Sequence, residues 1–121
     1  MSVINISKKL SAFSDLWSPK IITELNDSYV KLAKLKGEYV WHKHDNEDEM
    51  FLIIDGQLSI ELRDQILNLK AGELVVIPKG VEHRPVAHAE VSVILIEPKT
   101  TLSTGDAKNT EQKKSTHGEW I

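Results

Sequence analysis

The sequence contains no cysteine, and this absence removes several kinds of site at once. Disulfides, zinc sites held by thiolates and a cysteine nucleophile are all excluded. Any metal site must therefore be built from histidine and carboxylate side chains. The 121-residue chain supplies these with 5 histidines and 18 acidic residues.

Membrane and nucleic-acid signals are also missing. No apolar run reaches the roughly 18 residues that a membrane-spanning helix needs, and no basic segment leads into an apolar run with a cleavage site. The formal net charge is only -3, and the positive residues form no dense stripe of the kind that binds nucleic acid. We therefore expect a cytoplasmic protein that binds neither membranes nor nucleic acid.

The length suits a single domain with one hydrophobic core. A composition with 40% hydrophobic and 27% charged residues is ordinary for a globular chain. We divide the chain into an N-terminal segment with a short helix (1–20), a β-barrel (21–98) and a C-terminal tail (99–121).

The two ends differ from the middle in their patterns. Between Ile6 and Leu16 apolar residues recur at near-helical spacing behind a possible Asn5 cap, which predicts a short helix covering a barrel mouth. After Pro98 the composition shifts to Thr, Ser, Lys, Gly and Asn, so Lys99 to Glu119 is expected to have little independent structure. The final pair, Trp120-Ile121, either ends a solvated tail or docks on the body or on a second subunit.

The middle consists of short apolar runs separated by turn residues, the pattern of all-β barrels and sandwiches. Asp55-Gly56 between two such runs predicts a hairpin. Further turns are expected at Arg63-Asp64, from Lys70 to Glu73 and from Pro78 to Gly80, and a last buried strand from Val91 to Ile96.

The stretch that could form a functional site begins at His42 and His44, which are separated by one residue. If residues 38–44 form a strand, both imidazoles point to one face and can chelate an ion. Glu49 would head the inward face of the next strand, where an unpaired carboxylate is costly and a metal ion would remove that cost. His83 follows a tight turn and could complete the set from an adjacent strand.

Each residue also has an ordinary interpretation. The spaced histidines can occur by chance, the acidic residues from Asp45 to Asp48 suit a solvated loop, and His83 could be a surface or a hydrogen-bonded core residue. His88 and His117 lie outside the pattern and are interpreted as surface histidines.

Taken together, these residues resemble the two motifs of the cupin superfamily, in particular its small single-domain, mannose-6-phosphate isomerase-like members. The first motif is matched by Gly37, His42, His44, Glu49 and Gly56, and the second is matched by four further residues, namely Gly72, Pro78, Gly80 and His83. Two departures are visible: the gap from Gly37 to His42 is one residue short, and Val86-Ala87 stand where an asparagine usually closes the second motif. Neither departure removes a metal ligand.

The resemblance implies a jelly-roll barrel, or double-stranded β-helix, with one divalent transition metal per chain held by His42, His44, Glu49 and His83. It also implies a homodimer. It does not imply a reaction, because this fold carries many activities.

Three imidazoles and one carboxylate leave about two positions of an octahedral shell open, which suits Mn²⁺ first, then Ni²⁺ or Fe²⁺, with Co²⁺ or Zn²⁺ as further candidates. The expected small-molecule ligand is an anion or a chelating oxygen pair, such as a keto acid, an enediol or a sugar phosphate. No second carboxylate or tyrosine is clearly placed beside the four ligands as a general base. Three hypotheses stay open: a metal-dependent enzyme of isomerase or dioxygenase type, a non-catalytic binding or sensing protein, and a metal-free structural barrel.

Overall fold

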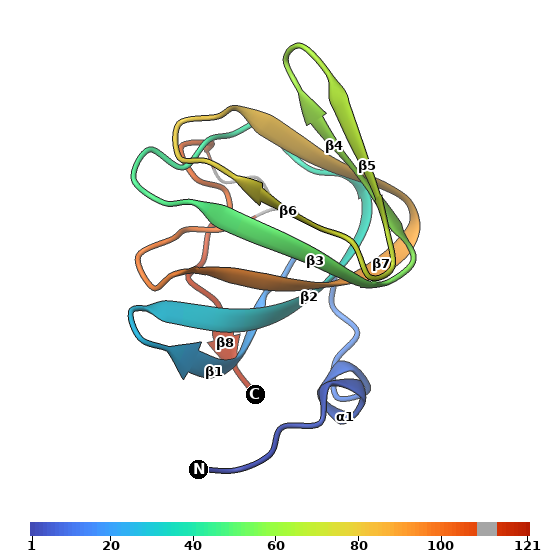
Figure 1. Ribbon diagram of the computed structural model, residues 1–121, viewed down its shortest axis with the longest axis vertical. Helices are drawn as coiled ribbons and strands as arrows, with labels where there is room; N and C mark the ends of the chain where they lie inside the picture. Colours follow the sequence, from blue (N-terminus) through green and yellow to red (C-terminus); the bar gives the residue numbers. More distant parts are fainter. Residues whose placement is uncertain (109–113) are drawn as a thin grey trace.

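The computed structural model, which describes residues 1–108 and 114–121, is an all-β barrel with one short helix (Figure 1). This confirms the expected jelly-roll, or double-stranded β-helix, fold. No helix in this part of the chain is long and apolar enough to cross a membrane. In chain order the elements are α1 (Ile6–Leu10), β1 (Lys20–Leu25), β2 (Ser28–Glu38), β3 (Glu49–Asp55), β4 (Gln57–Leu62), β5 (Ile66–Lys70), β6 (Leu74–Ile77), β7 (His83–Pro98) and β8 (Glu119–Trp120).

The long strand β7 joins the two halves of the barrel. One of its edges pairs antiparallel with β2, from Ser28 opposite Pro98 to Glu38 opposite Val86. Its other edge pairs with β4 near its start and with β3 near its end. The expected strand from Val91 to Ile96 is therefore only part of a longer strand that begins at His83.

The turns fall where the sequence predicts them. Gly56 connects β3 to β4 with a φ of 92°. A Cβ atom there would lie 3.0 Å from the carbonyl oxygen of Glu90, so glycine is required for both its conformation and its size. The turns at Arg63-Asp64 and from Lys70 to Glu73 likewise join β4 to β5 and β5 to β6.

Alternation along the strands builds the core. In β3, Phe51 and Ile53 are buried, while Met50 and Leu52 on the opposite face are half-buried. The same alternation recurs in β7. The inward side chains of six strands, β2 to β7, meet in one cluster, which includes Leu35, Phe51, Ile53, Leu58, Ile60, Leu69, Ile77, Val91, Val93 and Leu95.

The N-terminal helix is shorter than expected. It ends at Leu10 rather than Leu16, although Asn5 does cap it by accepting a hydrogen bond from the Lys8 N–H at 3.0 Å. The Lys34 ammonium donates to the carbonyls of Leu10 and Phe13 at 2.7 and 2.6 Å, so these carbonyls are not used in a continuing helix. The helix has no buried residue, so the expectation that it covers a barrel mouth is wrong.

The described part of the tail is packed rather than solvated. Thr101 and Thr104 have no exposed surface. Strand β8 pairs parallel with β1, and the Trp120 ring lies edge-on to Tyr29 at 5.7 Å between centroids. Of the alternatives for Trp120-Ile121, docking on the body is the one observed. The rest of the tail, residues 109–113, lies outside the described residues.

Candidate metal centre

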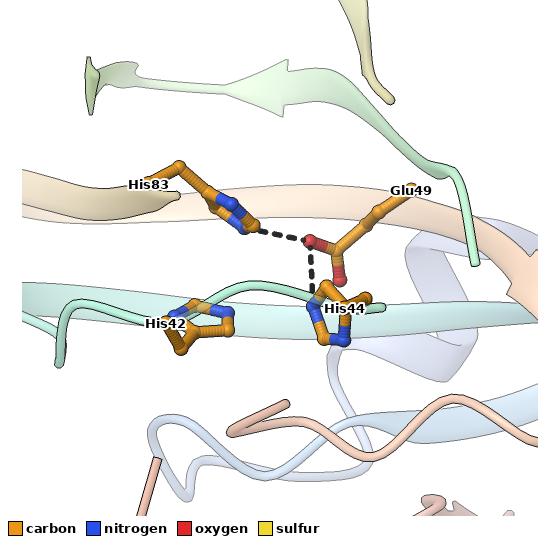
Figure 2. A group of neighbouring side chains, drawn as sticks. All are labelled: His42, His44, Glu49 and His83. Carbon is orange, nitrogen blue, oxygen red and sulfur yellow. Dashed lines mark hydrogen bonds and ion pairs between the residues drawn. The ribbon is translucent and has the colours of Figure 1, made fainter. Parts of the chain in front are cut away.

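The four predicted ligands meet inside the barrel. His42 and His44 lie in the segment between β2 and β3, Glu49 is the first residue of β3, and His83 is the first residue of β7. All four side chains are buried. Each residue offers one ligand atom, and these four atoms lie within 4.8 Å of one another. Figure 2 shows the four side chains pointing toward one another. This group could hold a metal ion.

The local structure differs from the expected strand over residues 38–44. Strand β2 ends at Glu38, and His42 forms only an isolated antiparallel bridge with His83. Their main chains exchange two hydrogen bonds of 3.1 and 2.9 Å. The pairing register of β2 shifts between Leu35 and Gly37, and Gly37 has a φ of 84°, so the chain leaves regular strand geometry there. The bridge, rather than strand alternation, places His42 beside His83.

Hydrogen bonds orient two of the imidazoles. The Nδ1 atoms of His42 and His83 each lie 2.9 Å from a carbonyl oxygen two residues earlier, on Val40 and Val81. A carbonyl only accepts, so each Nδ1 carries a proton, and Nε2 is the atom through which each ring can bind a metal. This is the arrangement that usually orients metal-binding histidines.

His44 lacks such a partner. Both of its ring nitrogens are buried and make no hydrogen bond within the described residues, and Nε2 lies 3.4 Å from Glu49 Oε1. The same carboxylate oxygen lies 3.2 Å from His83 Nε2 (Figure 2). Buried polar atoms are normally satisfied, and a cation shared with Glu49 would provide a partner for His44 Nε2.

Burial and neighbouring charges favour the metal-binding forms of His42 and Glu49. Burial and the neighbouring His83 lower the pKa of His42 to about 4, so its imidazole is neutral at pH 7. Burial would lower the pKa of His44, but the Glu49 carboxylate outweighs it and raises this pKa. Burial would raise the pKa of Glu49, yet His44 and His83 hold it well below its usual value. Glu49 is therefore the anionic member of the group.

A second buried carboxylate, Glu97, lies beside this group. The register of β3 and β7 sets Met50 opposite Ile96, which places Glu49 opposite Glu97 on the inner face. Burial and the charge of Glu49 raise the pKa of Glu97 well above its usual value. Its Oε1 accepts a hydrogen bond of 2.7 Å from the fully buried Lys31 ammonium. No motif in the sequence indicated this pair, although Glu97 continues the inward alternation of the last strand.

A small cavity of about 40 Å³ adjoins the group. By the same measure a water molecule needs roughly 10–15 Å³, so the cavity has room for about three. Burial raises the pKa of Tyr39 to about 12, so its phenol stays neutral. The remaining wall is apolar or aromatic and includes Trp17, which no sequence pattern indicated, and the polar lining consists of Tyr39, His42, Glu49, Glu97 and Ser103.

The tail holds the segment that carries the histidines. Between His42 and His44, the Lys43 N–H donates to Asp106 Oδ1 at 2.8 Å, and the Lys43 carbonyl accepts from the Asp106 N–H at 3.1 Å. A Cβ atom on Gly105 would collide with that carbonyl. No local signal in the sequence pointed to this contact.

The other acidic residues and histidines lie outside the group. Asp48 is exposed and accepts a hydrogen bond from the Lys79 N–H at 2.9 Å, and Glu47 accepts one from Thr100 Oγ1 at 2.9 Å. His88 and His117 are exposed, which agrees with their interpretation as surface residues.

Comparisons with a protein family and with solved structures show which proteins this chain is similar to. Residues 29–98 match the family described as the cupin domain. The chain is similar to a cupin-2 domain containing protein from Shewanella frigidimarina NCIMB 400, whose crystal structure has 51% sequence identity and a TM-score of 0.78 over 79% of this chain and 94% of that chain.

Two further relatives extend the likeness. The crystal structure of protein NMB1881 from Neisseria meningitidis has 33% identity and a TM-score of 0.74, covering 80% of this chain and 99% of that chain. A Bacillus subtilis (strain 168) protein called YdbB is 39% identical over 79 residues, which is 64% of this chain and 70% of that protein.

Proposed function

This chain belongs to the family of cupin domains, and on that premise we propose that it is a metal-dependent enzyme that acts on a small oxygen-rich or anionic metabolite. The reaction would be of isomerase or dioxygenase type. One observation carries the proposal: His42, His44, Glu49 and His83 are buried together with their ligand atoms within 4.8 Å of one another.

The residues fit a divalent ion. With bonds of about 2.0–2.2 Å, two ligand atoms on opposite sides of an ion are at most about 4.4 Å apart. The observed limit of 4.8 Å requires side-chain movements of only a few tenths of an ångström. Three neutral imidazoles and one carboxylate suit Mn²⁺ first, then Ni²⁺ or Fe²⁺, with Co²⁺ or Zn²⁺ as further candidates.

The residues around the group support catalysis. A bound divalent ion would supply Lewis-acid or oxygen-activating chemistry. Glu97 lines the same cavity as Glu49, so its carboxyl group is placed to give a proton to a ligand oxygen or to take one from it. The neutral Tyr39 phenol can donate a hydrogen bond to such a ligand. These two groups favour an enzyme.

A non-catalytic binding or sensing protein is the second candidate. The small cavity favours it, because about 40 Å³ leaves little room for a substrate to rearrange. A screen of small oxyanions and diols with the metal-loaded protein would separate the two candidates. Product formation supports the enzyme, whereas shifts in melting temperature without turnover support the binding protein.

We also propose a homodimer that uses the outer face of β6, β3 and β7. Leu74 and Val76 are 57% and 48% exposed there, although both are large and apolar. They lie opposite Leu52 and Met50 on β3, which in turn lie opposite two isoleucines of β7. Contiguous exposed apolar residues commonly mark an interface. Sedimentation of the wild type and of a Leu74→Glu, Val76→Glu variant tests this; a monomeric wild type would contradict it.

The function is tested by measuring the metal content of untagged protein purified without nickel resin or chelator. We expect stoichiometric transition metal in the wild type and none in the variant with His42, His44 and His83 changed to alanine. A wild type that is empty and also refuses added metal would overturn the proposal.

A finer test compares amide substitutions. Glu49→Gln removes the charge from the site and should weaken metal binding more than a hundredfold, beyond the roughly 10–100-fold typical of residues that only support a ligand. The matched control, Glu47→Gln, alters a carboxylate that contacts Thr100 instead. Equal affinities of the two variants would show that Glu49 is not a ligand.

A further inference from the structure

We propose that Trp17 limits the size of the ligand that reaches the metal centre, and that this ligand is a compact, uncharged or singly charged oxygen chelator with an apolar remainder. The inference deepens the proposed function and rests on it, because it concerns the cavity beside His42 and Glu49. Trp17 belongs to neither of the two sequence motifs, and it lies before residue 29, where the match to the family begins.

Trp17 reaches the cavity from outside the strands of the barrel. It lies between α1 and β1, yet its side chain lines the cavity together with Tyr39. The two rings are stacked, with centroids 4.5 Å apart and planes 13° apart. Tyr39 in turn meets His42 edge-on at 5.4 Å between centroids. Trp17 is thus the outer member of a row of rings that ends at a candidate metal ligand.

The Trp17 ring is held in place by its surroundings. Its backbone N–H donates to the Lys34 carbonyl and its indole N–H donates to the Lys36 carbonyl, both at 2.9 Å. Its φ is 56°, a conformation that is unfavourable for a bulky side chain. Such strain persists only where neighbouring contacts enforce it, and it is frequent at ligand sites. The indole therefore forms a fixed wall.

The charges around the cavity limit the class of ligand. Among the described residues that line it there is no lysine or arginine. The nearby Lys31 ammonium is already bonded to Glu97 at 2.7 Å. Apart from the metal ion, a phosphate dianion would meet no cationic side chain in this lining and would face the Glu97 carboxyl, which disfavours a sugar phosphate. A keto acid or an enediol needs no such partner.

The shape and polarity of the walls limit the remainder of the ligand. The cavity of about 40 Å³ leaves space for a few atoms beyond those bound to the metal. Phe51, Leu35 and Leu95 line it and offer contacts to a methyl or ethyl group. A phenyl group needs more space than this, and Trp17 forms part of the wall that would exclude it.

The test uses three probes on the Mn²⁺-loaded full-length protein, with metal content measured first. Acetohydroxamate and benzohydroxamate share a chelating group and differ in size, and phosphoglycolate adds charge. The variants are Trp17→Ala and Trp17→Gly, because glycine relieves the backbone strain if alanine does not fold. The matched control is Trp41→Ala, whose ring packs on Arg63 at 3.8 Å and does not line the cavity.

We expect the wild type and Trp41→Ala to bind acetohydroxamate about tenfold or more tightly than benzohydroxamate, since forcing extra volume into a packed site commonly costs that much affinity. In the Trp17 variants this preference should disappear, while phosphoglycolate stays weak in all proteins. Equal binding of the two hydroxamates by the wild type, an unchanged preference in both folded Trp17 variants, or tight binding of phosphoglycolate would overturn the inference. Absence of bound metal would instead refute the proposed function.

Discussion

The two ends of the barrel interior are built by the same strands yet contain opposite chemistry. In β3, Glu49 faces inward at the first position, and Phe51 and Ile53 follow it on the same face. In β7, Val91 and Val93 lie in the apolar middle, while the strand begins at His83 and carries Glu97 near its end. Strand alternation therefore positions the core and the two buried carboxylates, Glu49 and Glu97, whereas His42 is placed by its bridge to His83.

The difference teaches how stability and function are divided. Burying a large apolar side chain contributes about 1.5–3 kcal/mol, so the apolar end stabilises the fold. Burying Lys31, Glu97 and Glu49 carries a desolvation penalty that good geometry offsets only in part. We infer that the polar end is retained for its chemistry and that the apolar end compensates for it.

The largest expected effect comes from breaking the buried ion pair. Lys31→Met should lower the free energy of unfolding of the metal-free protein by about 3–5 kcal/mol, because it leaves Glu97 buried without its cation. Adding Glu97→Leu to the same chain should recover most of this loss. Urea titrations measure both values. A loss below about 1 kcal/mol for the single variant, the range of surface pairs, would show that the pair is not buried in solution.

Next in size is a change at the apolar end. Ile60→Ala removes atoms from a fully buried core position and should destabilise the protein by about 2–5 kcal/mol. Because Ile60 does not line the cavity, the metal bound per folded molecule should stay at the wild-type value. Unfolding curves and metal analysis of the folded fraction check this. Loss of metal from folded Ile60→Ala would mean that the two ends are not separable.

The polar end of the barrel interior should also make the stability of the protein depend on pH, through His42. The pKa of His42 is about 4 in the folded protein, whereas a histidine without these interactions, as in the unfolded chain, has a pKa of 6.5. The unfolded chain therefore binds more protons between these two pH values. Stability that is present above pH 6.5 is therefore lost as the pH falls toward 4, with a slope of about 1.4 kcal/mol per pH unit from this residue.

In metal-free protein, His42→Gln should reduce the slope between pH 6 and pH 4.5, a window inside those pKa values, by about that amount. His117→Gln, at an exposed histidine, is the control. Denaturant unfolding at several pH values provides the slopes. Parallel curves for the wild type and His42→Gln would indicate that His42 is not buried in its neutral form.

The smallest expected effect is at the contact between the tail and the histidine segment. Asp106→Ala removes the acceptor for the Lys43 N–H and should weaken metal binding about tenfold, as loss of a supporting residue commonly does. The control, Asp45→Ala, changes an exposed neighbour whose carboxylate lies 3.4 Å from the Lys43 ammonium. Isothermal titration with Mn²⁺ compares them, and a smaller effect for Asp106→Ala than for Asp45→Ala would contradict the supporting role.

The sequence alone determined the all-β class, the turns and the four residues of the candidate site. These signals are local: glycines mark turns, apolar alternation marks strands, and His42, His44 and Glu49 lie within eight residues of one another in the chain. Even so, the strand assumed for residues 38–44 was wrong, because a bulge and Gly37 end β2 early.

Only the tertiary structure decided what surrounds the four residues. Glu97 meets Glu49 because of the register between β3 and β7, and Lys31 meets Glu97 across β2 and β7. Trp17 is held beside the cavity by hydrogen bonds to carbonyls of β2. Asp106 accepts a hydrogen bond from Lys43, which lies 63 residues earlier in the chain. Periodicity says which face a residue occupies but not which distant residue lies opposite it, since that depends on how the strands align and where the loops return.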